Sequence, residues 1–399
     1  MTAIVVSGMR PTGRLHLGHY HGVLKNWLAL QENRECYFFV ADLHALTTHY
    51  EHPEGIRNST WDLLVEWLAV GLDPEKAVLF IQSWVPQHAE LALLLGMMTP
   101  LSWLERVPTF KDQQEQLRDK DLATYGFLGY PALMSADILL YDATEVPVGA
   151  DQVAHLEIAR ELARRFNSLY GRTASDQAAI EAGLQALGKK ARRNLEKLRE
   201  DYQREGSPQL LAQAQAIVTD AASISEVTRS LLMNYLEGKG RSILREPQVL
   251  LTAASKMPGL DGRKMSKSYG NTLGLREEPE QVRKKLLTMP TDPARVGRHD
   301  PGEPERCPVW PFHQAYSSVE TQAWVQEGCR SAGIGCVDCK QALVEKVIAE
   351  QAPIRERADY WAARPDDLRQ IAAAGAQKAR EKAAQTLARV QEVMGLDVH

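Results

Sequence analysis

The sequence predicts an α/β fold in which a doubly wound parallel sheet is joined to a large helical part. Three observations lead to this expectation. Short apolar runs alternate with segments of helical apolar spacing through residues 4–98. The composition changes over residues 172–245, where Ala, Gln, Glu, Lys and Arg dominate. From residue 278 onward the pattern is again mostly helical.

Three apolar runs have the length and composition of buried strands, namely Ile4–Ser7, Cys36–Ala41 and Val78–Gln82. Each run precedes a segment with the apolar spacing of a helix, and these segments are Leu17–Gln31, Ile56–Val70 and Ala89–Met98. The middle helix should end at Gly71, because this glycine is soon followed by Pro74. Such strand–helix alternation predicts parallel strands joined by crossover helices.

The helical segment 172–245 should be an insertion within the α/β unit. We therefore expect four regions: the first part of a catalytic domain (1–171), the helical insertion (172–245), the second part of the catalytic domain (246–277) and a helical domain (278–399). The insertion carries the basic run 189–193, which could contact nucleic acid, cover an active site, or be a solvated helix face. The chain ends in a charged amphipathic stretch, Asp366–Met394.

The formal net charge of −4 argues against a surface coated with positive charge. It does not exclude nucleic acid, because binding needs only a local basic face. No apolar run approaches the roughly 18 residues that a membrane-spanning helix needs. The N-terminus passes directly into a strand-like run at Ile4, without the pattern of a signal peptide. We therefore expect a cytoplasmic protein that is not bound to a membrane.

The first candidate motif for phosphate binding is His16-Leu17-Gly18-His19, at a predicted helix start after a Gly/Pro loop. A helix N-terminus presents unpaired N–H groups that suit a triphosphate. His16 and His19 can donate hydrogen bonds to phosphate oxygens, and Gly18 would let an adenine ring or ribose approach the backbone. Taken alone, two histidines here are more often a helix cap and a partly buried imidazole.

The second candidate motif is Lys264-Met265-Ser266-Lys267-Ser268, which follows a Gly/Asp turn at residues 259–262. Lys264 and Lys267 could neutralise the β- and γ-phosphates of a leaving pyrophosphate. A solvated loop would explain this segment equally well in isolation. The order of the two motifs, one after the first strand and one after the nucleotide fold, favours an ATP site.

These two motifs resemble the hallmark motifs of the class I aminoacyl-tRNA synthetases, whose catalytic domain is Rossmann-like. Within that class the chain is most similar to the tryptophanyl enzymes, and the resemblance runs through Ser7–Gly13, Ala41–Ala45, Leu79–Ser83, Met134–Tyr141 and Val146–Gln152. The resemblance implies ATP-dependent attachment of L-tryptophan to its tRNA through tryptophanyl-adenylate, with release of AMP and pyrophosphate. It also implies Mg²⁺ on the phosphates, an anticodon-binding role for the helical C-terminal domain, and a homodimer.

The resemblance also implies residue roles at the ATP site. The residues expected to act on phosphate charge are His16, His19, Lys264, Lys267 and Lys111. Those expected to bind ATP are Arg10, Pro11, Thr12, Gly18, His19, Gly149, Ala150, Asp151, Lys264, Met265, Ser266, Lys267 and Ser268. Family members commonly carry Asn at the position of His19 and Gln at that of Arg10. This chain therefore departs from the family pattern at these two positions, and the resemblance supports the roles of these two side chains less directly.

An amino-acid pocket is predicted around an apolar helix. Indole offers one N–H donor and no acceptor, so a selective site should bury one acceptor. Met134 and Asp137 lie three residues apart and can face one cavity. By resemblance, Asp137 receives the indole N–H and Met134 packs beside the ring. Helix capping is the plainer role for Asp137. The resemblance further assigns the substrate's ammonium and carboxylate to Tyr130 and Gln152, and places His44 near the pocket.

Four of the five cysteines crowd into one stretch with the spacing C-x21-C-x6-C-x2-C: Cys307, Cys329, Cys336 and Cys339. Four thiolates can hold either zinc or an iron–sulfur cluster. Zinc ribbons usually use two C-x2-C pairs, and the single pair here favours iron–sulfur. The spacing also resembles a subset of tryptophanyl enzymes that carry a [4Fe–4S] cluster in the tRNA-binding domain. Four unrelated buried thiols are the alternative.

Three other functions share parts of this pattern. A tyrosyl-tRNA synthetase would have the same fold and both motifs but a different pocket. A small-molecule nucleotidyltransferase could carry the first motif without needing the second or a long helical domain. A non-catalytic RNA-binding paralogue should show eroded phosphate motifs, whereas both motifs are intact here.

Overall fold

The computed structural model describes residues 2–105, 124–149, 152–172, 174–238, 241–251 and 257–396. Within them one parallel sheet has the strand order β3-β2-β1-β4-β5. Its strands are β1 (Ile4–Met9), β2 (Glu35–Val40), β3 (Ala77–Ile81), β4 (Glu145–Val148) and β5 (Gln248–Leu251). The chain builds the sheet outward from β1 to one edge, then returns to build the other side. The predicted doubly wound α/β fold is therefore confirmed.

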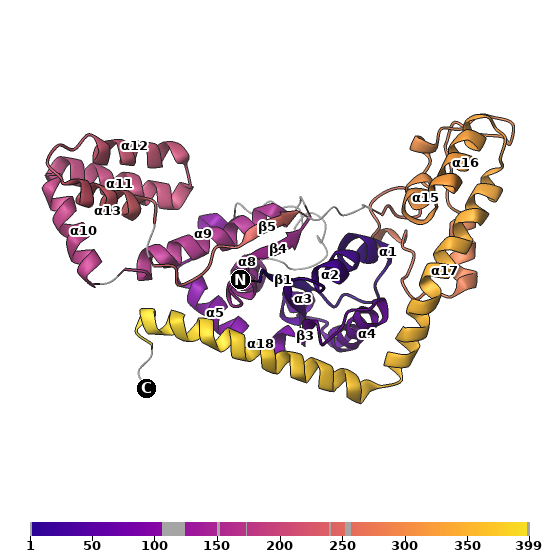
Figure 1. The fold of residues 1–399 in the computed structure, drawn as a ribbon, viewed down its shortest axis with the longest axis horizontal. Helices are drawn as coiled ribbons and strands as arrows, with labels where there is room; N and C mark the ends of the chain where they lie inside the picture. Colours follow the sequence, from indigo (N-terminus) through magenta and orange to yellow (C-terminus); the bar gives the residue numbers. More distant parts are fainter. Residues whose placement is uncertain are drawn as a thin grey trace.

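The helices of this α/β unit cover both faces of the sheet (Figure 1). They are α1 (Leu17–His19), η1 (Tyr20–Leu24), α2 (Lys25–Leu30), α3 (Asp42–His49), α4 (Glu54–Val70), η2 (Gln82–Trp84), α5 (Gln87–Gly96), α6 (Leu101–Glu105), α8 (Tyr125–Leu139) and α9 (Val153–Tyr170). The helix predicted over residues 17–31 contains a π turn, η1, at Tyr20–Leu24. As expected, α4 ends at Gly71, whose φ is +109°.

Alternate strand residues point into two separate cores. On one face Val5, Phe38 and Leu79 pack with Trp27 and Trp67. On the other face the next residues along each strand, Val6, Phe39 and Phe80, pack with side chains that include Leu91, Tyr141 and Phe166. A period of two is the normal consequence of a pleated strand. Because both faces are buried, these strands read as unbroken apolar runs in the sequence.

The residues expected to form an insertion make a bundle at one end of the molecule (Figure 1). Its helices are α10 (Ala174–Ala186), α11 (Lys189–Glu205), α12 (Pro208–Thr219) and α13 (Glu226–Leu236). The bundle has a hydrophobic cluster of its own, formed by Ile180, Leu184, Leu195, Val218, Leu232 and their neighbours. Its contact with α9 includes Arg199, which donates to the Ser168 hydroxyl and lies over the Tyr235 ring.

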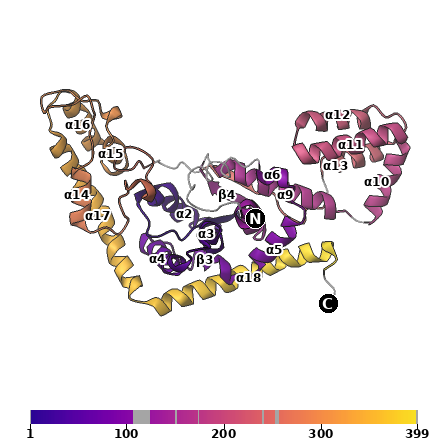
Figure 2. The same ribbon diagram turned by 180° about the vertical axis from the view of Figure 1, so that it is seen from behind.

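A helical arm projects at the opposite end of the molecule, as both views show (Figure 1, Figure 2). It follows the short turn η4 (Lys267–Tyr269) and contains α14 (Pro279–Leu287), η5 (Pro304–Arg306), α15 (Trp310–Tyr316), α16 (Val319–Arg330) and the long α17 (Cys336–Ala362). The last helix, α18 (Pro365–Met394), turns back and runs beneath the sheet. Across the described residues, no helix is both long and apolar enough to cross a bilayer.

Helix α18 lies directly against the edge strand β3. A Cβ atom at Gly375 would lie 1.9 Å from the carbonyl oxygen of Leu79, so the helix backbone touches the strand. The buried alanines Ala376, Ala379 and Ala383 extend this close contact into the core. The strand edge is thereby covered, which removes a site for unwanted pairing. The sequence indicated an amphipathic helix here but not this packing.

Candidate active site

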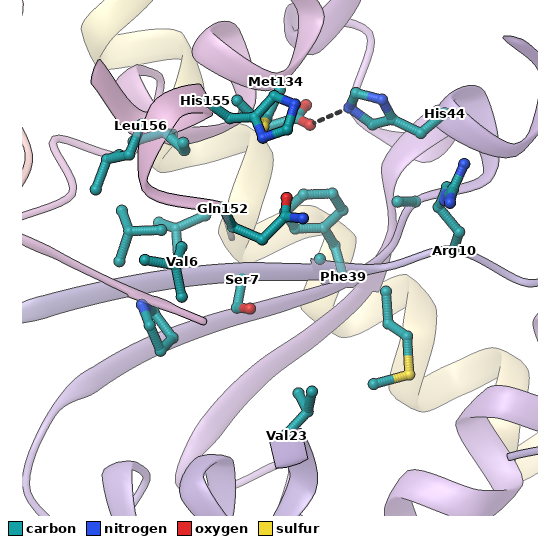
Figure 3. A pocket seen from close by; sticks show the side chains of 18 of the residues that line it. Val6, Ser7, Arg10, Val23, Phe39, His44, Met134, Gln152, His155 and Leu156 are labelled. Atoms are coloured by element: carbon teal, nitrogen blue, oxygen red, sulfur yellow. Dashed lines mark hydrogen bonds and ion pairs between the residues drawn. The ribbon is translucent and has the colours of Figure 1, made fainter. Parts of the chain in front are cut away.

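A cavity of about 530 Å³ opens beyond the carboxyl ends of β1 and β4. Neighbouring strands β1 and β4 mark the point where the chain reverses its direction of sheet building. Ligands of open α/β sheets bind at this switch point. The described lining residues come mainly from the end of β1, from β2 and α3, from α8, and from the β4–α9 connection. Arg10, His44, Met134 and Gln152 are among them (Figure 3). Tyr130, Asp137 and Gly149 line the cavity as well.

Asp137 is the buried acceptor of this cavity and is only 2% exposed. Its carboxylate accepts hydrogen bonds from His44 Nε2 at 2.8 Å, Gln82 Nε2 at 2.7 Å and His88 Nδ1 at 2.6 Å. Burial alone would raise the pKa of Asp137, but His44 and His88 outweigh it and hold the pKa at about 2. The carboxylate is therefore ionised at neutral pH. It lies within α8 and does not cap that helix, whose N-cap is Thr124.

The other predicted pocket residues lie around the same cavity. Met134 is one turn from Asp137 on α8, and Gln152 stands immediately before α9. Tyr130 makes a short hydrogen bond to His155 Nε2. All five residues assigned to the amino-acid pocket are thus brought together, and their individual roles remain predictions. Sequence reasoning missed His88 and Gln82, although Gln82 lies within the stretch Leu79–Ser83 that resembles the family.

The first motif begins a short helix with His16 as its N-cap. The rings of His16 and His19 lie 3.8 Å apart between centroids. Burial and, next, Lys267 lower the pKa of His16 to about 4. Burial, His16 and Lys267 lower the pKa of His19 to about 3. Both imidazoles are therefore neutral at pH 7, and each can donate one hydrogen bond. His19 and Gly149 line the cavity.

The second motif packs against the first. The backbone N–H of Gly18 donates to Met265 Sδ at 3.3 Å, and Lys267 Nζ donates to the carbonyl oxygen of Thr12 at 2.9 Å. The hydroxyls of Ser266 and Ser268 are 2.9 Å apart, while Lys264 is exposed. The loop before the first motif, which includes Pro11, therefore lies next to Lys267. Lys111, Ala150 and Asp151 lie outside the described residues.

A buried carboxylate that sequence reasoning did not find joins the two motifs. Glu66 on α4 is fully buried; it accepts from the backbone N–H of Leu15 at 2.8 Å and from Arg276 Nε at 3.0 Å. Burial outweighs the opposing effect of Arg276 and raises the pKa of Glu66 to about 7. Leu15 precedes His16, and Arg276 follows the second motif. Glu66 was read only as part of a helix, and nothing in its spacing set it apart.

The four clustered cysteines also come together, around a second, small cavity in the helical arm. Cys307, Cys329, Cys336 and Cys339 all line it, with Arg295 and Lys340 beside them. Burial and then the three other cysteines raise the pKa of Cys339 to about 12, so the four sulfurs are close enough to interact. In the described part of the chain, no group of three or more His, Cys, Asp or Glu side chains is arranged so that it could hold a metal ion.

A doubly wound parallel sheet with a cavity at its switch point, and with the two motifs packed against each other, is the arrangement of the catalytic domain of a class I aminoacyl-tRNA synthetase. Comparison with known families agrees with this class. The family described as tRNA synthetases class I (W and Y) matches residues 2–182 and 210–350. The chain belongs to this family.

Comparison with individual relatives shows which members of the family the chain is similar to. The chain is 58% identical over 393 residues to a tryptophan–tRNA ligase of Ralstonia nicotianae, with 98% of each chain covered. It is 43% identical to the tryptophan–tRNA ligase of Thermotoga maritima, covering 98% of this chain and 99% of the relative. The tryptophanyl-tRNA synthetase of Campylobacter jejuni, solved with ADP and tryptophan, matches with a TM-score of 0.74 at 27% identity, covering 98% of this chain and all of that one.

Proposed function

We propose that this chain attaches L-tryptophan to its tRNA, using ATP and passing through tryptophanyl-adenylate. The observation that carries the proposal is the buried, ionised carboxylate of Asp137 at the wall of a largely apolar cavity. Such a group accepts the single N–H of an indole. It would also accept a phenol O–H, but it supplies no hydrogen to the phenol oxygen, whereas an indole N–H needs none. The relatives named as tryptophan–tRNA ligases support the same substrate.

The proposed reaction has two steps. The carboxylate of tryptophan attacks the α-phosphate of ATP in line, and pyrophosphate leaves. A hydroxyl of the terminal adenosine of the tRNA then attacks the activated carbonyl, and AMP leaves. No enzyme nucleophile is required, so catalysis depends on positioning and on charge stabilisation. Mg²⁺ would enter with ATP and carry part of the phosphate charge.

The residues of the two motifs would hold the triphosphate. Neutral His16 and His19 would donate hydrogen bonds to phosphate oxygens, and Lys264 and Lys267 would offset the charge of the leaving pyrophosphate. The remaining ATP contacts would come from Arg10, Pro11, Thr12, Gly18, Gly149, Met265, Ser266 and Ser268, and also from Lys111, Ala150 and Asp151. Tyr130 and Gln152 would hold the ammonium and carboxylate of tryptophan.

The proposal includes an iron–sulfur cluster held by the four cysteines of the helical arm, with a zinc ion as the alternative. The four cysteines line one cavity, and four thiolates with a single C-x2-C pair favour the cluster. The cations Arg295 and Lys340 at the cavity would offset the negative charge of the thiolates. When bound, a [4Fe–4S] cluster would cross-link the segments that carry Cys307, Cys329, Cys336 and Cys339. We propose a structural role for it in the helical arm.

The proposal includes a homodimer. Four exposed apolar side chains lie on α5, at its C-terminal end, and on α6 and α8: Leu93 (59% exposed), Met97 (70%), Leu101 (63%) and Tyr125 (79%). The Tyr125 hydroxyl lies close to Gly96, which connects the two sides of this patch. A second copy of the chain would bury it, since exposed apolar patches mark association surfaces. We also propose that the protein is located in the cytoplasm.

Amino-acid-dependent ATP–pyrophosphate exchange tests the function. Tryptophan should support exchange. Tyrosine should support it at least about a hundredfold less well, because its phenol ring differs in shape from an indole and its oxygen also accepts a hydrogen bond, which a carboxylate cannot donate. Charging of tRNA should follow the same preference. Exchange that prefers tyrosine would favour the tyrosyl alternative, and a chain inactive with both amino acids would favour a non-catalytic RNA-binding protein.

A further inference from the structure

We infer that His88 and Gln82, which approach Asp137 from the core side, are positioning residues that reserve the Oδ2 atom of Asp137 for the indole N–H. The inference rests on the proposed function and deepens it. Neither side chain belongs to the described residues that line the cavity, and both are fully buried. They would therefore set substrate specificity without touching the substrate.

The two oxygens of Asp137 have different partners. Oδ1 accepts from both Gln82 Nε2 and His88 Nδ1, at 2.7 and 2.6 Å. Oδ2 accepts from His44 Nε2 at 2.8 Å, and His44 lines the cavity (Figure 3). Each carboxylate oxygen offers two acceptor positions. Among the described residues, the pair behind the cavity uses both positions of Oδ1, whereas one position on Oδ2 is left for a ligand.

The orientation of His88 is fixed from its other side. A carboxylate can only accept, so His88 Nδ1 must carry the hydrogen. His88 Nε2 lies 2.7 Å from the hydroxyl of Tyr141, and burial raises the pKa of Tyr141 well above its usual range. Tyr141 is therefore a protonated phenol that can donate to Nε2. A chain of hydrogen bonds from Tyr141 through His88 thus holds one histidine tautomer against Asp137.

Removing this support should change both the orientation and the charge of Asp137. Without His88 the Oδ1 atom loses a donor and the buried carboxylate loses part of what keeps it ionised. The carboxylate can then rotate, or take up a proton at a higher pH. Either change weakens its preference for a substrate that brings an N–H group. Fold stability and ATP binding do not depend on that preference.

The test compares tryptophan with β-(3-benzothienyl)-L-alanine, in which sulfur replaces the indole N–H. The wild-type enzyme should favour tryptophan in kcat/KM by about 10- to 100-fold, which is the effect of one unpaired buried acceptor. In His88→Leu this ratio should fall to a few-fold, mainly through the KM for tryptophan. His88→Asn, which keeps a donor near the Nδ1 position, should restore the greater part of the ratio.

The pH profile separates positioning from general damage. In His88→Leu the KM for tryptophan should rise as the pH falls from 7 to 5, because only His44 then remains to oppose the effect of burial on the pKa of Asp137. In the wild type it should stay nearly flat over that range. Tyr141→Phe should reduce the ratio less than His88→Leu does. Tyr37→Phe is the matched control, because Tyr37 stacks on Tyr141 and donates to Glu35.

Two results would overturn the inference. One is a folded His88→Leu enzyme with a normal KM for ATP, a wild-type substrate ratio and a flat pH profile. The other is an equal loss in His88→Asn and His88→Leu, which would indicate a purely structural role. A wild-type enzyme that does not activate tryptophan would instead contradict the proposed function, so the two failures can be told apart.

Discussion

The backbone N–H of Gly18 donates to the Sδ atom of Met265 at 3.3 Å. This bond joins two motifs that lie 247 residues apart in the chain. Further contacts support it: the N–H of Leu17 donates to the carbonyl of Leu273, and that of Leu275 to the carbonyl of Leu15. A Cβ atom at Gly18 would come within 3.4 Å of Met265 and closer still to His16, so glycine permits the contact. The histidines and lysines proposed to act on phosphates are therefore held as one assembly.

Lys267→Ala should lower the rate of tryptophan activation far more than the affinity for tryptophan. The Lys267 amine donates to the carbonyl oxygen of Thr12 in the loop before the first motif, and Lys267 is not among the described residues that line the cavity. Loss of one group that stabilises charge in the transition state costs about 10²–10³ in rate. Pyrophosphate exchange measures the change, with Lys378→Ala on α18 as an exposed-lysine control. Exchange near the wild-type rate would show that the lysine has no such role.

Asp137→Asn should reduce kcat/KM for tryptophan by about 10- to 100-fold. The Asn side chain turns one acceptor oxygen into a donor, which then faces Gln82, His88 or His44. A buried polar group left unpaired costs about 1–3 kcal/mol. Steady-state exchange at varied tryptophan measures the effect. The KM for ATP should change little, and an unchanged kcat/KM for tryptophan would mean that Asp137 does not face the indole.

Glu66→Gln should remove one part of the pH dependence of stability. The pKa of Glu66 in the folded chain is about 7, above its ordinary value of 4.5. A raised pKa stabilises the fold below the ordinary value, and this contribution is lost as the pH rises through the folded value. The wild type should therefore lose about 3 kcal/mol relative to Glu66→Gln between pH 4.5 and 7.5. Urea unfolding of both proteins across this range measures it, and parallel curves would contradict it.

Gly375→Ala should destabilise the protein by several kcal/mol, because its methyl group would collide with the backbone of Leu79 and force α18 away from β3. Gly55→Ala in α4 is the matched control. A Cβ atom at Gly55 meets no atom within 4 Å, so this variant should be as stable as the wild type or more stable by up to about 1 kcal/mol. Thermal unfolding measures both. Equal melting temperatures for the two variants would show that α18 does not hold β3 closely.

Anaerobically purified protein should be brown and contain iron, if the proposed cluster is present. Cys336→Ser should lose the colour and the iron, because one of four ligands is replaced. Charging of tRNA should then fall more than pyrophosphate exchange, since the cluster lies in the helical arm, away from the cavity at the sheet. Cys36→Ala is the control, because Cys36 lies in β2 and not beside the other four. Colourless wild-type protein with one zinc per chain would overturn the cluster.

The two motifs and the pair Met134 and Asp137 could be predicted because their residues are local in the chain, whereas Tyr130, Gln152 and His44 were predicted by resemblance to the family. The first motif is a helix start, and Met134 and Asp137 are one helical turn apart. The residues that sequence reasoning missed act over long distances. Glu66 reaches Leu15 and Arg276, and His88 reaches Asp137 from another helix. No spacing rule relates such pairs, because only the folded sheet brings their helices together.

The sequence by itself determined the alternation of strands and helices, because burial on both faces of a parallel sheet requires unbroken apolar runs. It also determined the residue types of the two motifs proposed to bind phosphate, and the presence of four clustered cysteines. Only the tertiary structure decided that α18 covers the edge strand β3, and that the four cysteines share one cavity. It also decided which donors hold the carboxylate of Asp137. These features require segments that are distant in the sequence to come together. The favourable free energy that brings them together comes from burial of the whole hydrophobic core.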